Sequence, residues 1–294
     1  MNESSMWLGV PFASVAIVGA AFIVLFAAER LVPLRARRTA VAGRLVVNAC
    51  VSALALITAY FVVTPAAMAA LQAISVQRMG ALQWVRLSEA VEVVVGFVLM
   101  DLSFYYWHMA NHKIRFLWRF HNVHHIDPDL DVSTAFRFHF GEVALSAIFR
   151  VVQIVLIGVT PLTFALYEIV FELNTLFHHS NVRLPLALER WLNKVLVTPR
   201  MHGIHHSDVR QENNANYSIV LSWWDRLHRT LRLNIAQRSI VIGIPAYLDP
   251  ANNVVGNVLV LPFRTQRAYW QTVDGTIVVR THGEAAAPRN LMQA

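Results

Sequence analysis

Two long stretches in the first third of the chain are apolar and carry no charge. Residues 6–28 contain no charged side chain, and neither do residues 45–77. A helix that crosses a bilayer needs about 20 apolar residues, whereas buried helices of soluble proteins are usually shorter. The pattern therefore predicts a first membrane span over about residues 10–28 and a second within residues 45–74.

A third long helix is predicted to begin near Ser88, a residue type favoured at helix N-caps. Glu89 and Glu92 would lie in its first turn, where negative charge suits the helix dipole. The helix runs on to the aromatic residues 104–107, a type common at the membrane interface. It contains Asp101, and a carboxylate within a membrane helix is a functional candidate because its burial is costly.

Residues 143–177 are apolar again, but Gly158 and Pro161 interrupt them. Each limb has only about 15 residues, which is short for a full span. We interpret the segment as a helical hairpin that returns the chain to the side it left, with two thin or tilted spans as the alternative. Further on, residues 239–248 and 254–263 are short apolar runs that predict strands or surface-lying segments.

Composition supports an integral membrane protein, because 56% of the 294 residues are hydrophobic and 15% are charged. Residues 1–5 carry no Lys or Arg, so the first span is expected to be retained and not cleaved as a secretory signal. The single cysteine, Cys50, excludes an internal disulfide and a cysteine-based metal site. The formal charge is +7, and the sequence contains no nucleic-acid-binding motif. The positive charge therefore favours contact with anionic membrane lipid.

The arginine distribution predicts an orientation. Five arginines lie within residues 30–44, so this loop should be cytoplasmic under the positive-inside rule. Two crossings later, the end of the third helix is on the same side, and so is the chain after the hairpin. All the histidine clusters are therefore expected on the cytoplasmic side of the membrane.

Histidines carry the strongest chemical signal. Thirteen are present, and eleven of them lie between His108 and His206. His108 and His112 are four residues apart and share a helix face, while the pattern HxxHH occurs at residues 121–125 and again at 202–206. In this pattern the adjacent pair diverges by about 100° of helix rotation. One cluster could thus contact two neighbouring metal ions.

The number of histidines argues for two metals. Imidazole suits Fe, Zn, Cu and Ni, and eight histidines in three short boxes exceed what one tetrahedral zinc needs. Two ions, each with an open position for O2 or substrate, would fit. The absence of HExxH argues against a zincin protease. A metal-ion transporter and a di-haem cytochrome are the alternatives, although a transporter would place its ligands midway across the bilayer.

Five segments resemble the fatty acid hydroxylase superfamily, which includes sterol desaturases, sterol and sphingolipid hydroxylases and alkylglycerol monooxygenase. They are DLSFYYWHMANH, LWRFHNVHHID, HHSNVRLP, TPRMHGIHHS and NANYSIVLSWWDRLHRT, and they fall within residues 101–230. The resemblance implies an all-α, multi-span helical membrane bundle with a cytosolic helical cap that carries a histidine-ligated di-iron centre. The metal ligands that it implies are His108, His112, His121, His124, His125, His179, His202, His205 and His206, with His178 and His139 as additional candidates.

The implied activity is O2-dependent oxidation, in the first place hydroxylation, of an aliphatic C–H bond in a lipid or sterol-like substrate. Lipid desaturation and ether-lipid monooxygenation are alternatives within the family. The cofactors would be two iron ions, which zinc can replace on purification, and O2 would be the co-substrate. Electrons would come from an external ferredoxin or small cytochrome with its reductase, since the sequence holds no glycine loop for a dinucleotide.

Two carboxylates are candidates for orienting a metal ligand from outside the coordination sphere, namely Asp101 and Asp225. Pairing of Asp101 with Arg150 inside the bundle is the structural alternative. The chain would divide into transmembrane helices over residues 1–107, a catalytic histidine-box region over residues 108–230 that includes the hairpin, and a cytosolic C-terminal segment over residues 231–294.

Overall fold

The computed structural model describes the backbone of residues 3–280 and the side chains of residues 14–280. Helices are its regular elements, and the described residues form only isolated β-bridges and no strand, which confirms the all-α prediction. Residues 281–294, the end of the predicted C-terminal segment, lie outside the described residues. The helices are α1 Glu3–Leu31, α2 Val41–Thr58, α3 Thr64–Gln77, α4 Glu89–Lys113, α5 Arg115–His125, α6 Phe140–Ile157, α7 Pro161–His179, α8 Leu186–Leu192, α9 Pro199–His205, α10 Arg210–Asn213, α11 Trp223–Leu227 and α12 Val255–Val260.

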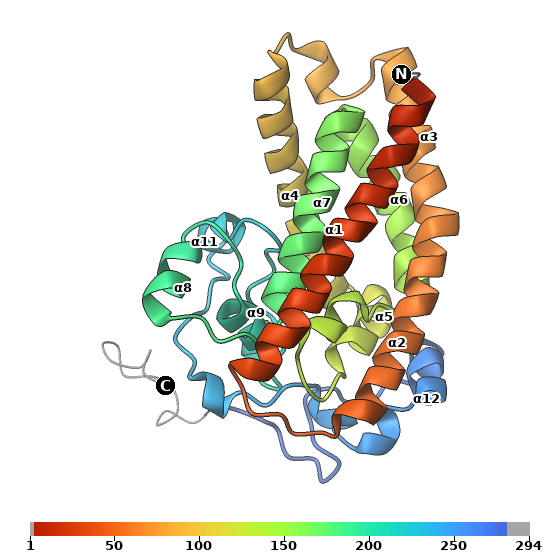
Figure 1. The fold of residues 1–294 in the computed structure, drawn as a ribbon. Helices are drawn as coiled ribbons and strands as arrows, with labels where there is room; N and C mark the ends of the chain where they lie inside the picture. Colours follow the sequence, from red (N-terminus) through yellow and green to blue (C-terminus); the bar gives the residue numbers. More distant parts are fainter. Residues whose placement is uncertain (1–2, 281–294) are drawn as a thin grey trace.

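The long helices stand side by side as a bundle, and the short ones gather at one end of it (Figure 1). Large apolar side chains on the outer faces of the long helices are exposed, including Ile23, Phe61 and Leu156, as expected where lipid is the solvent. The bundle is therefore that of an integral membrane protein. Four of its segments are long and apolar enough to cross a membrane, namely Ser14–Leu31, Val41–Trp84, Glu89–Lys113 and Phe140–Ile157.

The second predicted span is one continuous helical rod over residues 41–77, in which a π-helical stretch, Ala59–Val63, joins α2 to α3. At 1.5 Å per residue the rod is about 55 Å long, well beyond the ~30 Å of a bilayer core. Its first turns reach into the cap, where Arg44 Nε donates to Asp127 Oδ1 at 2.6 Å. Arg44 Nη1 donates to Asp131 Oδ2 at 2.6 Å, so α2 ties the bundle to the cap.

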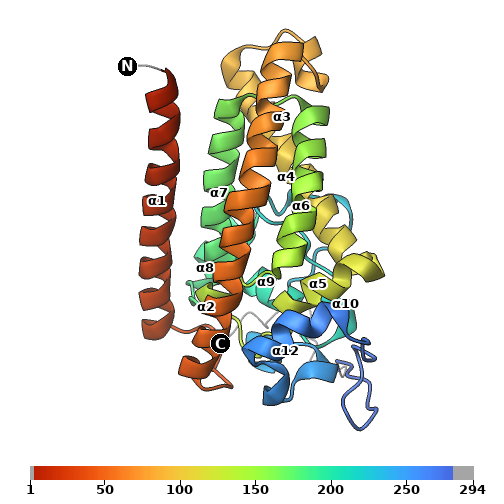
Figure 2. The same ribbon diagram turned by 90° about the vertical axis from the view of Figure 1, so that its right-hand side faces the viewer.

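Residues 143–177 form the expected helical hairpin, with limbs α6 and α7 of 18 and 19 residues. Its tip lies at the end of the bundle opposite the cap, against the connection between α3 and α4. There a Cβ on Gly80 would lie 2.4 Å from the Cα of Gly158, and Gln83 Nε2 donates to the Gly158 carbonyl at 2.8 Å. Since it touches this far connection, the hairpin runs the full height of the bundle (Figure 2).

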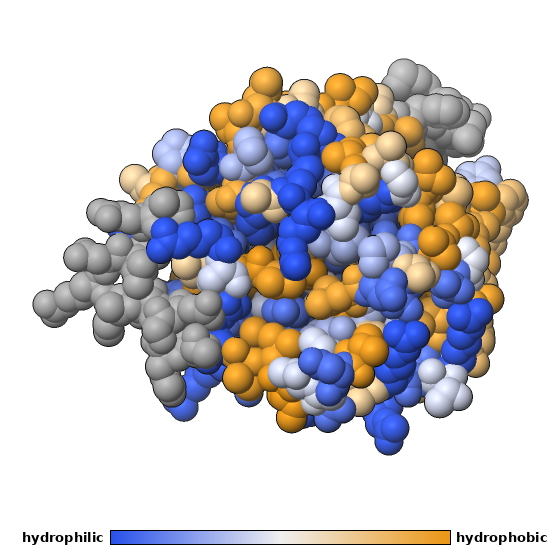
Figure 3. Space-filling view, turned by 90° about the horizontal axis from the view of Figure 1, so that it is seen from below, coloured by the Kyte–Doolittle hydropathy of each residue, from blue (hydrophilic) through white to orange (hydrophobic). Residues whose placement is uncertain are grey.

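The cap and the arginine-rich loop lie at the same end of the bundle. The Leu34 amide donates to the Asn181 carbonyl at 2.7 Å, just beyond α7, and Arg35 Nη1 donates to Gln237 Oε1 at 2.6 Å. Seen from this end, the surface carries hydrophilic side chains across much of its area (Figure 3). The loop and the histidine boxes thus lie at the same end of the bundle.

Two local predictions need correction. Residues 239–248 and 254–263 are neither strands nor surface-lying as a whole, because Ile240, Ile242 and Ile244 are buried and the second run contains α12. The conformation of these two runs is decided by tertiary packing against the cap, and their short apolar pattern does not determine it. Helix α4 begins where expected, but the Ser88 side chain makes no capping hydrogen bond.

Candidate metal centre

Nine buried or half-buried histidines converge where four helices meet in the cap. Helix α4 supplies two of them, α5 supplies three, α7 ends in one, and α9 with the residue after it supplies three. They form two groups, and the candidate ligand atoms of each group all lie within 4.8 Å of one another. The first group is His108, His112, His121, His125 and His205, and the second is His124, His179, His202 and His206.

Both HxxHH boxes contribute to both groups. In the box on α5, His124 belongs to the second group and its two partners to the first, whereas in the box on α9 only His205 belongs to the first. The divergence of adjacent side chains around a helix explains this division. The groups also touch, because the rings of His125 and His206 stack at 4.4 Å between centroids. The spacing therefore builds two adjoining sites.

The outer ring nitrogens of several of these histidines are fixed by hydrogen bonds. Nδ1 of His108 donates to the Tyr217 carbonyl at 2.7 Å, and Nδ1 of His205 donates to the Ala215 carbonyl at 2.7 Å. In the second group, Nδ1 of His179 donates to the Thr175 carbonyl at 2.8 Å. Such bonds fix the tautomer and leave Nε2 with its lone pair facing inward, as in metal-binding histidines.

The inner nitrogens either face another imidazole nitrogen, as His202 Nε2 and His179 Nε2 do at 3.0 Å, or are buried without a partner. Both ring nitrogens of His112 lack a hydrogen bond, and so does Nε2 of His205. Burying a polar atom without a partner is costly. Burial, with neighbouring imidazoles, also lowers the pKa of His205 to about 3 and the pKa of His202 well below its usual value. Neutral imidazoles with free lone pairs are what metal ions need, so these residues fit two ions.

The two additional candidates lie outside both groups. His139 caps α6, where Nδ1 accepts from the Gly141 amide at 2.9 Å and Nε2 donates to the Leu259 carbonyl at 3.0 Å. Both of its nitrogens are therefore used structurally. His178 packs on His202 at 4.1 Å between ring centroids, and its Nε2 is buried without a partner. It borders the second group without joining it.

Asp101 and Asp225 fix the segment that follows α10 and contact no histidine directly. Asp101 accepts from the Leu221 amide at 3.0 Å and from Trp224 Nε1 at 2.7 Å. The alternative in which Asp101 pairs with Arg150 is wrong, because Arg150 Nη2 instead lies 2.9 Å from Glu168 Oε1.

Asp225 lies closer than Asp101 to the two histidine groups. It accepts from the Tyr217 amide at 2.9 Å, and the carbonyl of Tyr217 in turn holds His108. Tyr217 thus connects Asp225 to His108, a candidate metal ligand. Any influence on the metals would pass through the backbone of Tyr217.

Sequence reasoning missed Glu142 and the backbone carbonyls that hold the ligands. Nδ1 of His121 donates to Glu142 Oε1 at 2.8 Å, and Asn213 contacts His125 Nδ1 at 3.2 Å. Glu142 stands in the first turn of a helix, where an acidic residue is ordinary. Every residue has a backbone carbonyl, so only the tertiary structure identifies which carbonyls accept hydrogen bonds from the histidines.

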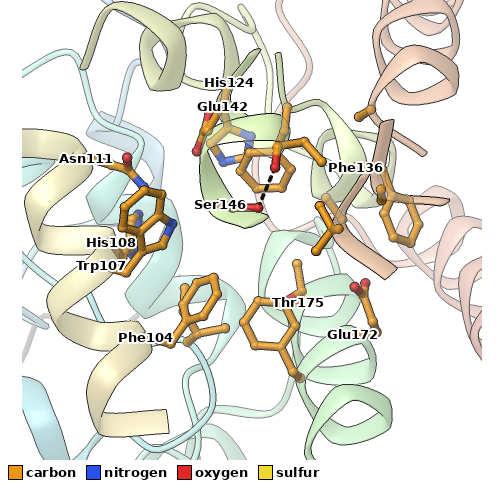
Figure 4. Close-up of a pocket in the computed structure, with 18 of the residues that line it drawn as sticks. Phe104, Trp107, His108, Asn111, His124, Phe136, Glu142, Ser146, Glu172 and Thr175 are labelled. Atoms are coloured by element: carbon orange, nitrogen blue, oxygen red, sulfur yellow. Dashed lines mark hydrogen bonds between the residues drawn. The ribbon is translucent and has the colours of Figure 1, made fainter. Parts of the chain in front are cut away.

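A cavity of about 200 Å³ enters the bundle beneath the metal groups. Aromatic side chains form much of its wall, including Phe104 and Trp107 (Figure 4), and Ala55 and Ala59 line its α2 side. Histidines of both groups also line it, among them His108 and His124. The cavity therefore opens on both candidate metal sites at once.

Polar side chains run along two facing helices of this cavity. On α6 they are Glu142, Ser146 and Arg150, which lie at intervals of four residues, and on α7 they are Glu168, Glu172, Thr175 and His179. Each set lies on one helix face. The hydroxyl of Thr175 is buried without a partner. An otherwise apolar cavity thus has polar groups from the metal end to the middle of the bundle.

Residues 93–230 match the family model of the fatty acid hydroxylases, and all nine histidines lie within this stretch. This part of the chain belongs to the fatty acid hydroxylase family. Sequence reasoning therefore identified the correct family from the histidine boxes, and the two groups are histidine clusters able to hold metal in a family member.

Several relatives carry names that state an activity. The ornithine lipid hydroxylase OlsE of Rhizobium tropici is 33% identical over 155 residues, which is 53% of this chain and 46% of that protein. Human cholesterol 25-hydroxylase is 28% identical over 46% of this chain and 49% of its own length. Human alkylglycerol monooxygenase is 28% identical over 46% of this chain and 29% of its own. The matches thus span half or less of each relative, and no solved structure matches significantly.

Proposed function

We propose that this fatty acid hydroxylase family member is a membrane-bound, non-haem di-iron enzyme that hydroxylates an aliphatic C–H bond of a lipid or sterol-like substrate. The observation that carries the proposal is the cavity, which is largely apolar and reaches histidines of both groups. The named relatives act as hydroxylases or monooxygenases. A site for a long apolar molecule beside two metal sites fits such a reaction.

Two iron ions held by the nine histidines would activate O2 for the reaction, and zinc could replace them on purification. Hydroxylation consumes one O2, two electrons and two protons, and yields the alcohol and one water. The buried histidines keep the reacting end of the cavity away from bulk solvent. Glu142 holds His121 in one orientation.

The cavity also favours a kind of substrate. Its aromatic and alanine walls would hold an apolar body with one C–H bond directed toward the histidines. The polar residues at the middle of the bundle, Arg150, Glu168 and Glu172, would bind a polar group at the other end of the molecule. A lipid or sterol with one polar end meets both requirements. Asp101 and Asp225 would act as positioning residues through the loop that they hold.

We also propose that the cap faces the cytoplasm, as the arginines of residues 30–44 indicate. An external electron carrier, a ferredoxin or a small cytochrome with its reductase, would then supply the two electrons. Lipid desaturation and ether-lipid oxidation remain alternatives with the same residues, and the relative named alkylglycerol monooxygenase supports the second. A metal-ion transporter is disfavoured, because the histidines lie at one end of the bundle and not midway along it.

The test is purification in mild detergent from iron-supplemented cells, followed by reaction of a lipid extract with 18O2 and a chemical reductant. We expect about two metal ions per chain and a lipid product that carries 18O. A variant with His205→Ala and His206→Ala should lose metal and form no product. Absence of metal in the wild type, or haem iron in its place, would overturn the proposal.

A further inference from the structure

A second hollow of the molecule lies outside the bundle, between α5, α10 and the chain over residues 263–279. Helices α5 and α10 meet where Asn213 contacts His125 Nδ1 at 3.2 Å, and Lys113 Nζ at the end of α4 donates to Asn214 Oδ1 at 3.2 Å. Both helices lie in the cap (Figure 2). We call the hollow the basic cleft, after the cations that line it. They are Lys113, Arg115, Arg119, Arg210, Arg264 and Arg267.

The positive charge of the basic cleft is uncompensated. No Asp or Glu is among the described residues that line it, and none of its six cations forms an ion pair with a described carboxylate. Some arginines elsewhere in the cap are paired with carboxylates, as Arg200 is with Glu189 at 2.6 Å. Six cations without a carboxylate partner among the described residues therefore line one opening, which would attract an acidic partner.

A candidate metal ligand, His112, lines the basic cleft. Of the nine histidines, only His112 is partly exposed, and it lines this cleft. Trp118 packs between the cleft and the first group, with its ring centroid 4.9 Å from that of His112 and 5.4 Å from that of His125. Trp270 stacks on Trp118 at 6.2 Å and lines the cleft. In the cleft, His112 and Trp118 thus link the surface of the cap to the first group.

We propose that an acidic one-electron carrier protein docks in the basic cleft and delivers electrons to the metal site above His112. The inference rests on the proposed function, which needs two electrons for each O2. At each docking the carrier is oxidised by one electron and the metal site is reduced by one, so two dockings complete a turnover. A packed route through Trp118 serves electron transfer, whereas an anionic lipid head group would need only the cations.

The experiment measures binding and needs no turnover. The probe is an acidic plant-type [2Fe–2S] ferredoxin, titrated against the full chain in nanodiscs of zwitterionic lipid. The cleft variant carries Arg115→Glu and Arg210→Glu. Both arginines are exposed and line the cleft, and their side chains form no hydrogen bond with the described residues. The matched control carries Arg37→Glu and Arg38→Glu, which change the charge equally at the same end of the molecule.

We expect the Kd for ferredoxin to rise about tenfold or more in the cleft variant and to change by less than about twofold in the control. Wild-type binding should weaken with salt, since the screening length falls from about 10 Å at 0.1 M to about 3 Å at 1 M. Equal effects of the two variants, or no binding by the wild type, would overturn the proposal.

A second titration separates lipid from protein, with dioctanoyl phosphatidylglycerol as the anionic lipid probe. If the cleft variant loses affinity for this lipid while ferredoxin binding is unchanged, the cleft is a head-group site and the proposal is wrong. Failure of the proposed function would look different. In that case ferredoxin would still bind in the cleft, but the protein would form no lipid product with a chemical reductant.

Discussion

His121 and Glu142 are joined by a hydrogen bond of 2.8 Å from the imidazole Nδ1 to the carboxylate Oε1. The bond connects the histidine box on α5 to the first turn of α6, the helix that walls the cavity. The other oxygen of Glu142 is buried without a partner. A single carboxylate thus positions a metal-ligand candidate and also lines the proposed substrate site.

Glu142→Gln should weaken metal binding about 10- to 100-fold, the usual effect of losing a partner of a metal-bound histidine. The neutral amide no longer supports the charge that a metal places on His121. Competition with a chromophoric chelator measures the affinity. Glu89→Gln, an exposed change at the other end of α4, is the control, and equal affinities in the two variants would show that Glu142 does not support the site.

The division of the histidines predicts how metal content falls. His202→Ala with His206→Ala removes two ligands of the second group only, so about one ion per chain should remain of the two proposed. His205→Ala with His206→Ala removes one ligand from each group, and both ions should be lost in part. Elemental analysis of the purified variants measures this. Loss of both ions in the variant with His202→Ala and His206→Ala would contradict two separate sites.

Asp101→Asn should lower stability more than metal content. Asp101 accepts from the Val220 amide at Oδ1 and from the Leu221 amide and the Trp224 indole at Oδ2. Asn has only one acceptor oxygen, so its NH2 must face donors on one side. Leaving a buried donor unpaired costs about 1–3 kcal/mol. Thermal unfolding in detergent measures the loss. Unchanged stability with a large fall in metal content would instead assign Asp101 a direct role at the metal site.

Filling the cavity should stop oxidation without removing metal. Ala59 lies in the π-helical stretch and lines the cavity, so Ala59→Phe places a ring where the substrate would lie. Product formation should fall on the order of 10- to 100-fold, because misplacement of the reacting bond is costly. Ala53→Phe, on an exposed position of α2, is the matched control. Full activity of Ala59→Phe would mean that the substrate binds elsewhere.

The sequence by itself determined the spans, the helical class and the histidine boxes, and its resemblance to the family indicated the nine histidines that converge. These features depend on local order, because apolar length decides whether a helix can cross a bilayer and helical periodicity decides which histidines share a face. The hairpin over residues 143–177 and the start of α4 could be predicted for the same reason.

Only the tertiary structure decided which histidine joins which group, and it gave Asp101, Arg150 and Glu142 their partners. Each of these depends on how helices far apart in sequence pack together, as when α6 brings Glu142 to His121 across 21 positions. The cavity and the basic cleft likewise exist only where several elements meet. Spacing along one helix carries no information about the face that a distant helix presents to it, so these features arise with the packed fold.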